Sequence, residues 1–170
     1  TAIASVRAGN IIGGGDWAED RLIPDIFRSI LVNKPIKIRN PNSIRPWQFI
    51  LDALHGYLLL IEKLWDDGPK YSGAWNFGSI EDAKTVSWIT KKLTELWHTN
   101  IDWEFEKKEN KHEANYLELD CSKSSRMLSW KPKMDLNMAL EWIVNWYKQY
   151  QQQNEIKLFT EKQIEKYEIL

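Results

Sequence analysis

The most informative run for the architecture is Arg7-Ala-Gly-Asn10-Ile-Ile-Gly-Gly-Gly-Asp16-Trp-Ala-Glu-Asp20-Arg21-Leu-Ile-Pro24-Asp25. It continues an apolar segment, Ala2 to Arg7, that predicts a strand. Three successive glycines then permit backbone angles that other residues avoid, which predicts a loop from Gly9 to Trp17. Pro24 fits the first turn of a helix whose apolar residues share one face. A strand, a loop and a helix in this order indicate an α/β fold.

The rest of the chain continues the alternation of strands and helices. Strands are predicted at 36–39, 74–77, 101–105 and 116–119, with a turn at 40–43. Helices are predicted at 51–64, 85–96, 122–130, 136–150 and around 164–167, with Gly68-Pro69 as the stop of the first of these and Thr85 as the cap of the second.

Composition excludes several classes of protein. Apolar residues make up 43% of the chain and charged residues 28%, which is typical of a globular protein rather than a disordered one. The 23 basic and 24 acidic side chains leave a net charge of −1, so neither nucleic acid nor an anionic membrane is an expected partner. The single Cys121 excludes an internal disulfide framework and favours a reducing cytoplasm.

No motif in the sequence supplies a catalytic apparatus. A glycine-rich pyrophosphate loop between strand and helix is absent, and so is a Tyr-x-x-x-Lys pair. His55, His98 and His112 are scattered without metal-ligand spacing. We therefore expect no catalytic residue and no metal site in this chain.

What remains is a set of residues suited to binding an anion. Arg21, Arg39 and Arg45 lie in or beside loops, and a guanidinium group binds phosphate oxygens in a bidentate manner. Asn10 follows a strand end, where side chains often meet ligands. Any one of these arginines could equally be a solvated surface charge, and composition alone leaves both interpretations open.

The order of the motifs resembles a known family. The run from Arg7 to Asp25 is similar to the second half of the extended short-chain dehydrogenase/reductases that act on nucleotide sugars. Within them, Ile38-Arg39-Asn-Pro41 and Arg45-Pro-Trp-Gln48 resemble the CDP-glucose 4,6-dehydratases. Further matches follow in family order at 75–78, 112–114, 119–123 and 130–132, so the resemblance spans essentially the whole chain.

The resemblance implies a particular part of that fold. It assigns residues 1–170 to the C-terminal part of an extended short-chain dehydrogenase/reductase, with late Rossmann strands plus the smaller α/β substrate-binding domain. The N-terminal NAD-binding Rossmann part is expected to be absent, because Thr1 is not an initiator Met and a strand is already under way at Ala2. We expect the chain alone to be inactive, and the strand at Ala2 to Val6 to be an edge that lacks partners. The intact enzyme is expected to be a homo-oligomer.

The resemblance also implies roles for individual residues. Asn10 matches a residue at the diphosphate and sugar, and Arg45 matches an arginine that clamps the diphosphate. Ala8 falls beside the nicotinamide, through its backbone. The remaining matches are Arg21 and Leu22 beneath the diphosphate and nucleoside, Ile38 and Arg39 on the strand beside the base, and His112 and Glu113 on a late loop closing over the nucleotide.

The implied reaction is the NAD-dependent conversion of CDP-D-glucose to CDP-4-dehydro-6-deoxy-D-glucose and water, a step toward the deoxysugars of surface polysaccharides. One departure concerns substrate contact, because the family usually has His where Phe49 stands. Two other functions stay open. The chain could derive from another NAD-dependent nucleotide-sugar epimerase or reductase, or it could be a non-catalytic module that binds nucleotide sugars.

Overall fold

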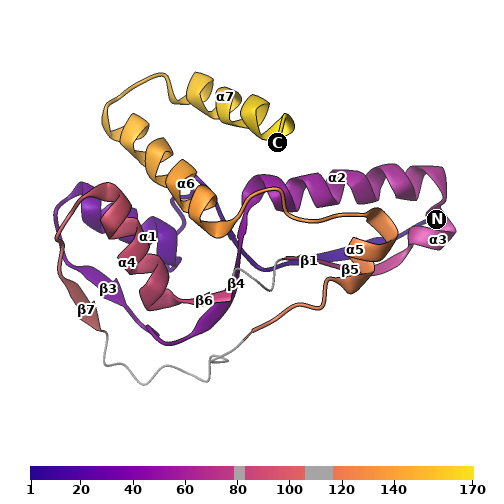
Figure 1. Ribbon diagram of the computed structural model, residues 1–170, viewed down its shortest axis with the longest axis horizontal. Coiled ribbons are helices and arrows are strands. Elements are labelled where there is room, and N and C mark those ends of the chain that lie inside the picture. The colour runs from indigo at the N-terminus through magenta and orange to yellow at the C-terminus, as the bar shows by residue number, and fades with distance from the viewer. Residues whose placement is uncertain (79–82, 106–116) are drawn as a thin grey trace.

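Small, mainly parallel strand pairs organise the chain in the computed structural model, which describes residues 1–78, 83–105 and 117–170 (Figure 1). Within these residues, three pairs are parallel: β1 (Ala4–Ala8) with β5 (Gly73–Phe77), β2 (Asn10–Ile12) with β4 (Ile44–Phe49), and β3 (Ile36–Ile38) with β7 (Trp103–Phe105). One pair is antiparallel: β4 with β6 (Ala83–Thr85).

Helices separate the strands and cover them. In chain order they are α1 (Leu22–Leu31), α2 (Ile50–Asp66), α3 (Gly68–Tyr71), α4 (Val86–Trp97), α5 (Ser122–Leu128), α6 (Leu136–Gln151) and α7 (Ile156–Glu168). The expected α/β class is confirmed.

The apolar residues form two cores at opposite ends of an elongated molecule (Figure 1). In the larger core, the ring of Phe27 in α1 stacks on Tyr147 of α6 at 3.8 Å between centroids. In the smaller core, Phe77 of β5 meets Trp130 edge to face at 5.0 Å. Most of the tryptophan-rich composition is used in this packing, as the helical spacing of Trp142 and Trp146 predicts.

Side-chain caps fix where two of the helices begin. Thr85 Oγ1 accepts a hydrogen bond from the Trp88 amide at 3.2 Å, which confirms the predicted cap of α4. Asp135 Oδ1 accepts from the Met138 amide at 2.8 Å at the start of α6. Each oxygen satisfies an amide that the first turn of a helix leaves without a partner.

A buried carboxylate fastens the C-terminal helix to the rest of the molecule. Asp52 of α2 is 1% exposed, and its Oδ1 accepts hydrogen bonds from the Tyr167 hydroxyl and the Lys133 amide, both at 2.7 Å. Burial raises the pKa of Asp52, although both hydrogen bonds oppose that rise. The same burial, with Asp52 beside it, raises the pKa of the Tyr167 hydroxyl. Asp52 thus joins α2, the loop before α6, and α7.

Several expected elements differ from the structure. The predicted loop at 9–17 contains β2, and the segment that became β4 was not predicted as a strand. Pro46 explains the second miss, because proline inside a run argues against a strand, yet here it faces Ala83 across an antiparallel pair. Residues 117–119 form no strand. Gly68 is not a simple stop, because α3 begins at this residue, and α7 begins eight residues before the predicted Ile164.

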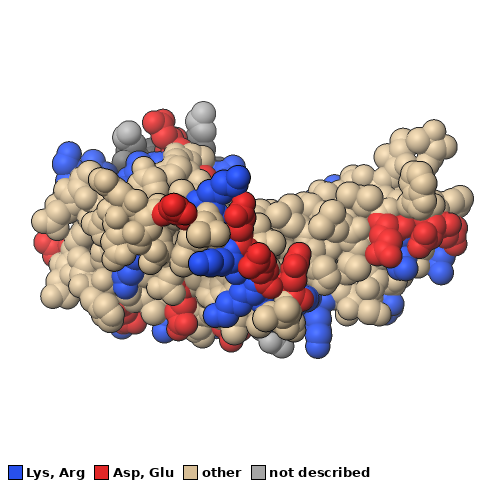
Figure 2. Space-filling view, turned by 90° about the horizontal axis from the view of Figure 1, so that it is seen from above, with Lys and Arg blue, Asp and Glu red and all other residues tan. Residues whose placement is uncertain are grey.

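One apolar stripe faces outward instead of inward. Leu54, Leu58, Ile61 and Trp65 of α2 have exposed fractions of 43%, 65%, 61% and 90%, while Ala53, Gly56 and Leu60 form the buried face. Uncharged side chains predominate over the part of the surface around α2 in Figure 2. The helical periodicity was therefore correct, but it did not reveal which side of α2 meets the core.

None of the helices in the described parts of the chain is both long enough and apolar enough to cross a membrane.

Candidate functional site

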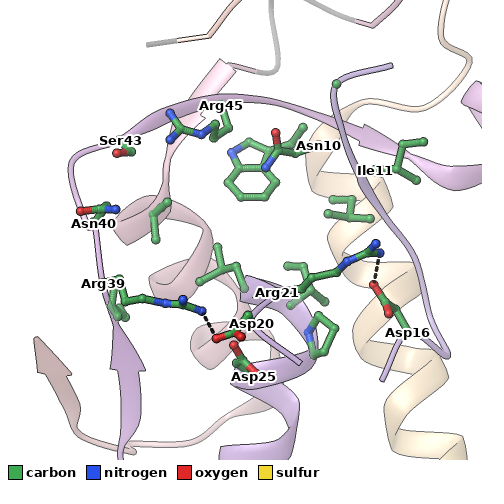
Figure 3. Close-up of a pocket in the computed structure, with 18 of the residues that line it drawn as sticks. Asn10, Ile11, Asp16, Asp20, Arg21, Asp25, Arg39, Asn40, Ser43 and Arg45 are labelled. Carbon is green, nitrogen blue, oxygen red and sulfur yellow. Dashed lines mark hydrogen bonds and ion pairs between the residues drawn. The ribbon is translucent and has the colours of Figure 1, made fainter. Parts of the chain in front are cut away.

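A cleft of about 980 Å³ opens beside the larger core, between the 9–25 segment and the strands β3 and β4 (Figure 3). Six of the residues singled out from the sequence line it: Asn10, Arg21, Leu22, Ile38, Arg39 and Arg45. These residues are up to 35 positions apart (45 − 10), and strand pairing brings them together.

The pairing of β2 with β4 builds the inner wall. Asn10 begins β2 and lies opposite Trp47 in the parallel register. The indole of Trp47 is 3% exposed, and its Nε1 donates to the Lys84 carbonyl at 2.9 Å. This hydrogen bond ties β4 to β6 and fixes the ring at the cleft. Trp47 is thus both a core residue and a lining residue.

Arg45 is the most enclosed cation of the cleft. It lies on β4 with 7% exposure, and its Nη1 donates to the Ile44 carbonyl at 2.9 Å. In Figure 3, Arg45 lies on the same side of the cleft as Asn10, and Arg21 and Arg39 lie on the other. An enclosed guanidinium group is suited to binding an anion, because little water competes for its hydrogen bonds.

The other two arginines are each paired with a carboxylate. Arg21 Nη1 lies 3.2 Å from Asp16 Oδ2, and Arg39 Nη2 lies 2.7 Å from Asp20 Oδ1 (Figure 3). Both pairs are open to solvent, and the Asp20 side chain is 81% exposed. Such pairs contribute at most about 1 kcal/mol. Arg21 and Arg39 are therefore held in position but can be released at little cost.

The loop that carries these carboxylates is anchored on two helices. Arg28 of α1 donates to the carbonyls of Trp17 at 2.7 Å and Ala18 at 3.1 Å, and it also pairs with Asp25. The Tyr147 hydroxyl of α6 donates to the Asp16 carbonyl at 2.6 Å. Burial raises the pKa of this hydroxyl, which keeps it a donor. The loop therefore has a defined shape.

Some predicted site residues lie elsewhere. Ala8 ends β1 opposite Phe77 and is not part of the cleft wall, and His112 and Glu113 lie outside the described residues. Sequence reasoning missed Lys37, Ser43, Asp16 and Asp20 as lining residues. A signal for the two aspartates was available, because both lie within the glycine-rich run that carries Arg21.

The described lining of the cleft is suited to binding. It contains arginine, lysine, aspartate, amide and apolar side chains, and no histidine, cysteine or tyrosine among the described residues. No group of three or more potential metal ligands occurs within residues 1–78, 83–105 and 117–170. Cations beside a fixed aromatic wall fit an anion that is attached to a flat ring.

Comparison with known proteins shows which proteins the chain is similar to. The CDP-glucose 4,6-dehydratase of Salmonella typhimurium is 47% identical over 166 residues, which are 97% of this chain and 46% of that protein. By sequence, this chain is homologous to CDP-glucose 4,6-dehydratase. The resemblance recognised from the motifs is thereby confirmed. The dTDP-glucose 4,6-dehydratase of Haemophilus influenzae is more distant, at 26% identity over 83% of this chain and 43% of that protein. No protein-family model matches the chain.

Solved structures agree on the fold. The UDP-glucuronic acid 4-epimerase of Bacillus cereus, in complex with UDP-4-deoxy-4-fluoro-glucuronic acid and NAD, superposes with a TM-score of 0.76 at 20% identity. The match covers 88% of this chain and 46% of the epimerase. The fold is thus that of part of an extended short-chain dehydrogenase/reductase. The chain spans about half the length of the curated relatives it matches.

Proposed function

We propose that this chain supplies the nucleotide-sugar site of a CDP-glucose 4,6-dehydratase. The intact enzyme is a hydro-lyase that converts CDP-D-glucose to CDP-4-dehydro-6-deoxy-D-glucose and water. The observation that carries the proposal is the 47% identity over 97% of the chain, joined to a cleft that collects the motif residues. Residues 1–170 then form the substrate-binding part, and the NAD-binding part lies outside them.

Each side of the cleft receives a part of the substrate in this proposal. Arg45, enclosed on β4, binds the diphosphate, and Asn10 contacts the diphosphate and sugar. Arg21 and Leu22 lie beneath the diphosphate and nucleoside at the start of α1. Ile38 and Arg39, at the end of β3, flank the base or ribose. The Arg39 side chain is 42% exposed, so a ligand can reach it from solvent.

NAD is the proposed cofactor of the intact enzyme, in which it carries a hydride transiently. The described residues do not form a dinucleotide site by themselves, because no glycine-rich pyrophosphate loop joins a strand to a helix among them. The chain offers the end of β1, where Ala8 lies in register with Phe77. We propose that the backbone of Ala8 borders the nicotinamide, and that another part of the enzyme holds the rest of NAD.

The remaining proposals concern the intact protein. We propose that it is a homo-oligomer. We also propose that it is located in the cytoplasm, since the single Cys121 suits a reducing compartment. His112 and Glu113 are proposed to close over the nucleotide.

The test is a calorimetric titration of the chain with CDP, UDP and dTDP. We expect binding that favours CDP, because the proposal places Ile38 and Arg39 beside the base. Arg45→Ala should abolish measurable CDP binding, since it removes the enclosed cation. Arg45→Lys should weaken binding by about tenfold, because an ammonium group keeps the charge but loses the bidentate fork. The matched control is Arg126→Ala on α5, an exposed arginine outside the cleft wall.

The outcomes separate the candidate functions. Equal or tighter binding of UDP or dTDP would support another nucleotide-sugar enzyme. If Arg45→Lys and Arg45→Ala bind CDP as the wild type does, and each keeps a native near-ultraviolet circular dichroism spectrum, then the cleft is not the CDP-binding site. The same spectrum tells loss of a contact from loss of folding, because it reports the packing of the tryptophans.

A further inference from the structure

An acidic residue lies directly on one of the proposed ligand-binding arginines. Asp20 Oδ1 contacts Arg39 Nη2 at 2.7 Å, and this pair joins the 16–20 loop to the end of β3 across one side of the cleft (Figure 3). Both residues line the cleft. A carboxylate on a guanidinium group occupies the same donors that an acceptor of a ligand would need.

The chain holds Asp20 in this position by local means. Its backbone is left-handed, with φ of 62°, and this conformation turns the loop just before α1 begins. Arg28 fixes the preceding turn through the Trp17 and Ala18 carbonyls. The pair therefore follows from a defined loop conformation rather than from two long side chains that meet by chance.

We propose that Asp20 is an internal competitor of the ligand for Arg39, and that it limits the affinity of the cleft for a nucleoside diphosphate. The proposal rests on the proposed function, because it takes Arg39 as a residue that binds the ligand. When the nucleotide enters, the carboxylate gives up the guanidinium group to it and returns to solvent, where it is already 81% exposed. Asp20 therefore determines affinity and takes no part in the chemistry.

The expected gain in CDP affinity follows from the solvent exposure of the Asp20–Arg39 pair. A solvent-exposed ion pair is weak, so releasing Arg39 should tighten CDP binding by about threefold. Asp20→Asn is the appropriate change, since asparagine tolerates the left-handed conformation and removes only the charge. The gain should shrink as salt is raised, because salt screens exposed charges.

The experiment compares CDP binding to the wild-type chain, Asp20→Asn and Glu19→Gln by calorimetry. Glu19 is exposed and lies next to Asp20 in the same loop. Glu19→Gln removes the same charge, so it controls for general repulsion of the phosphates. A double-mutant cycle then repeats Asp20→Asn in an Arg39→Gln background. We expect tighter binding in Asp20→Asn alone, and no gain where Arg39 is replaced.

The results decide between the two proposals separately. If the folded wild-type chain binds no CDP, the proposed function and this inference both fail. If it binds CDP, but Asp20→Asn equals Glu19→Gln, or the gain persists in Arg39→Gln, only the competition is overturned. Weaker binding in Asp20→Asn would also overturn it, because Asp20 would then position Arg39 for the ligand.

Discussion

Asp52 is the residue whose surroundings have the clearest consequence for stability. Its Oδ1 accepts two hydrogen bonds, and among the described residues Oδ2 is buried without a partner. Nearby, His55 has a lowered pKa, mainly because it is partly withdrawn from water. Withdrawal of this carboxyl from water favours its protonated form, and this is why the pKa of Asp52 is raised.

This raised pKa gives stability a definite dependence on pH. The folded chain binds a proton at Asp52 more tightly than the unfolded chain does, so lowering pH from neutral toward 3.8, the ordinary pKa of aspartate, should favour folding through this group. The free energy of unfolding of the wild type should therefore rise relative to that of Asp52→Asn over this range. Urea unfolding at a series of pH values measures the difference. The Asp52 carboxylate also raises the pKa of His55, so its loss makes His55 oppose folding more strongly at low pH and adds to the difference in the same direction.

Asp66→Asn provides the control for this comparison. Asp66 lies at the exposed end of α2, beside Lys63 at 3.9 Å. A pH-independent difference between the wild type and Asp52→Asn, or the same trend in Asp66→Asn, would contradict the role given to burial.

Among the elements, α2 shows how close packing determines a residue against its helix propensity. Gly56 lies in the interior of α2, where alanine is ordinarily favoured by about 1 kcal/mol. A Cβ atom at this position would lie 2.4 Å from Phe77 Cδ1 and 2.9 Å from Trp130 Nε1. The helix therefore approaches β5 and the segment after α5 as closely as only glycine allows.

Gly56→Ala should accordingly destabilise the chain. We expect a net loss of about 1–2 kcal/mol, because overpacking of the smaller core exceeds the gain in helix propensity. Chemical unfolding followed by tryptophan fluorescence measures it. Gly78→Ala is the matched control, since a Cβ there would lie no closer than 3.7 Å to any atom of the residues that the structure describes. An increase in stability for Gly56→Ala would mean that Phe77 and Trp130 shift without cost.

For the whole molecule, the main feature is a strand edge open to association. Within the described residues β1 pairs only with β5, and Val6 is 41% exposed. A strand edge of this kind can pair with another chain. The strand expected at Ala2 to Val6 spans Ala4–Ala8 in this structure, and it pairs with β5 instead of lacking partners.

We expect the chain to associate as its concentration rises. Val6→Lys should shift the assembly toward monomer, because a lysine on an open edge opposes strand pairing. Sedimentation velocity over a range of concentrations measures the effect. Val32→Lys, at a residue 61% exposed beyond the end of α1, adds the same charge away from the edge. A monomeric wild type at all concentrations, or equal shifts in both variants, would count against association through β1.

The sequence was sufficient for features that depend on local chemistry. The cap at Thr85, the helix that starts before Pro24, and the strands around Ile36 and Trp75 follow from short-range patterns. The family was also evident from ordered motifs, since these contain specific residue combinations that survive at 47% identity.

Long-range pairing could not be obtained from those patterns. β2 lies among glycines and β4 contains Pro46, so each becomes a strand only because the other lies beside it. The same pairing places Asn10 and Arg45 on one cleft. The outward stripe on α2 and the contact of Asp20 with Arg39 also depend on which surfaces meet, because periodicity specifies the faces of a helix and not their partners. The sequence by itself thus determined the residue types and much of the local conformation. Only the tertiary contacts determined the shape of the cleft and which of its charged side chains pair.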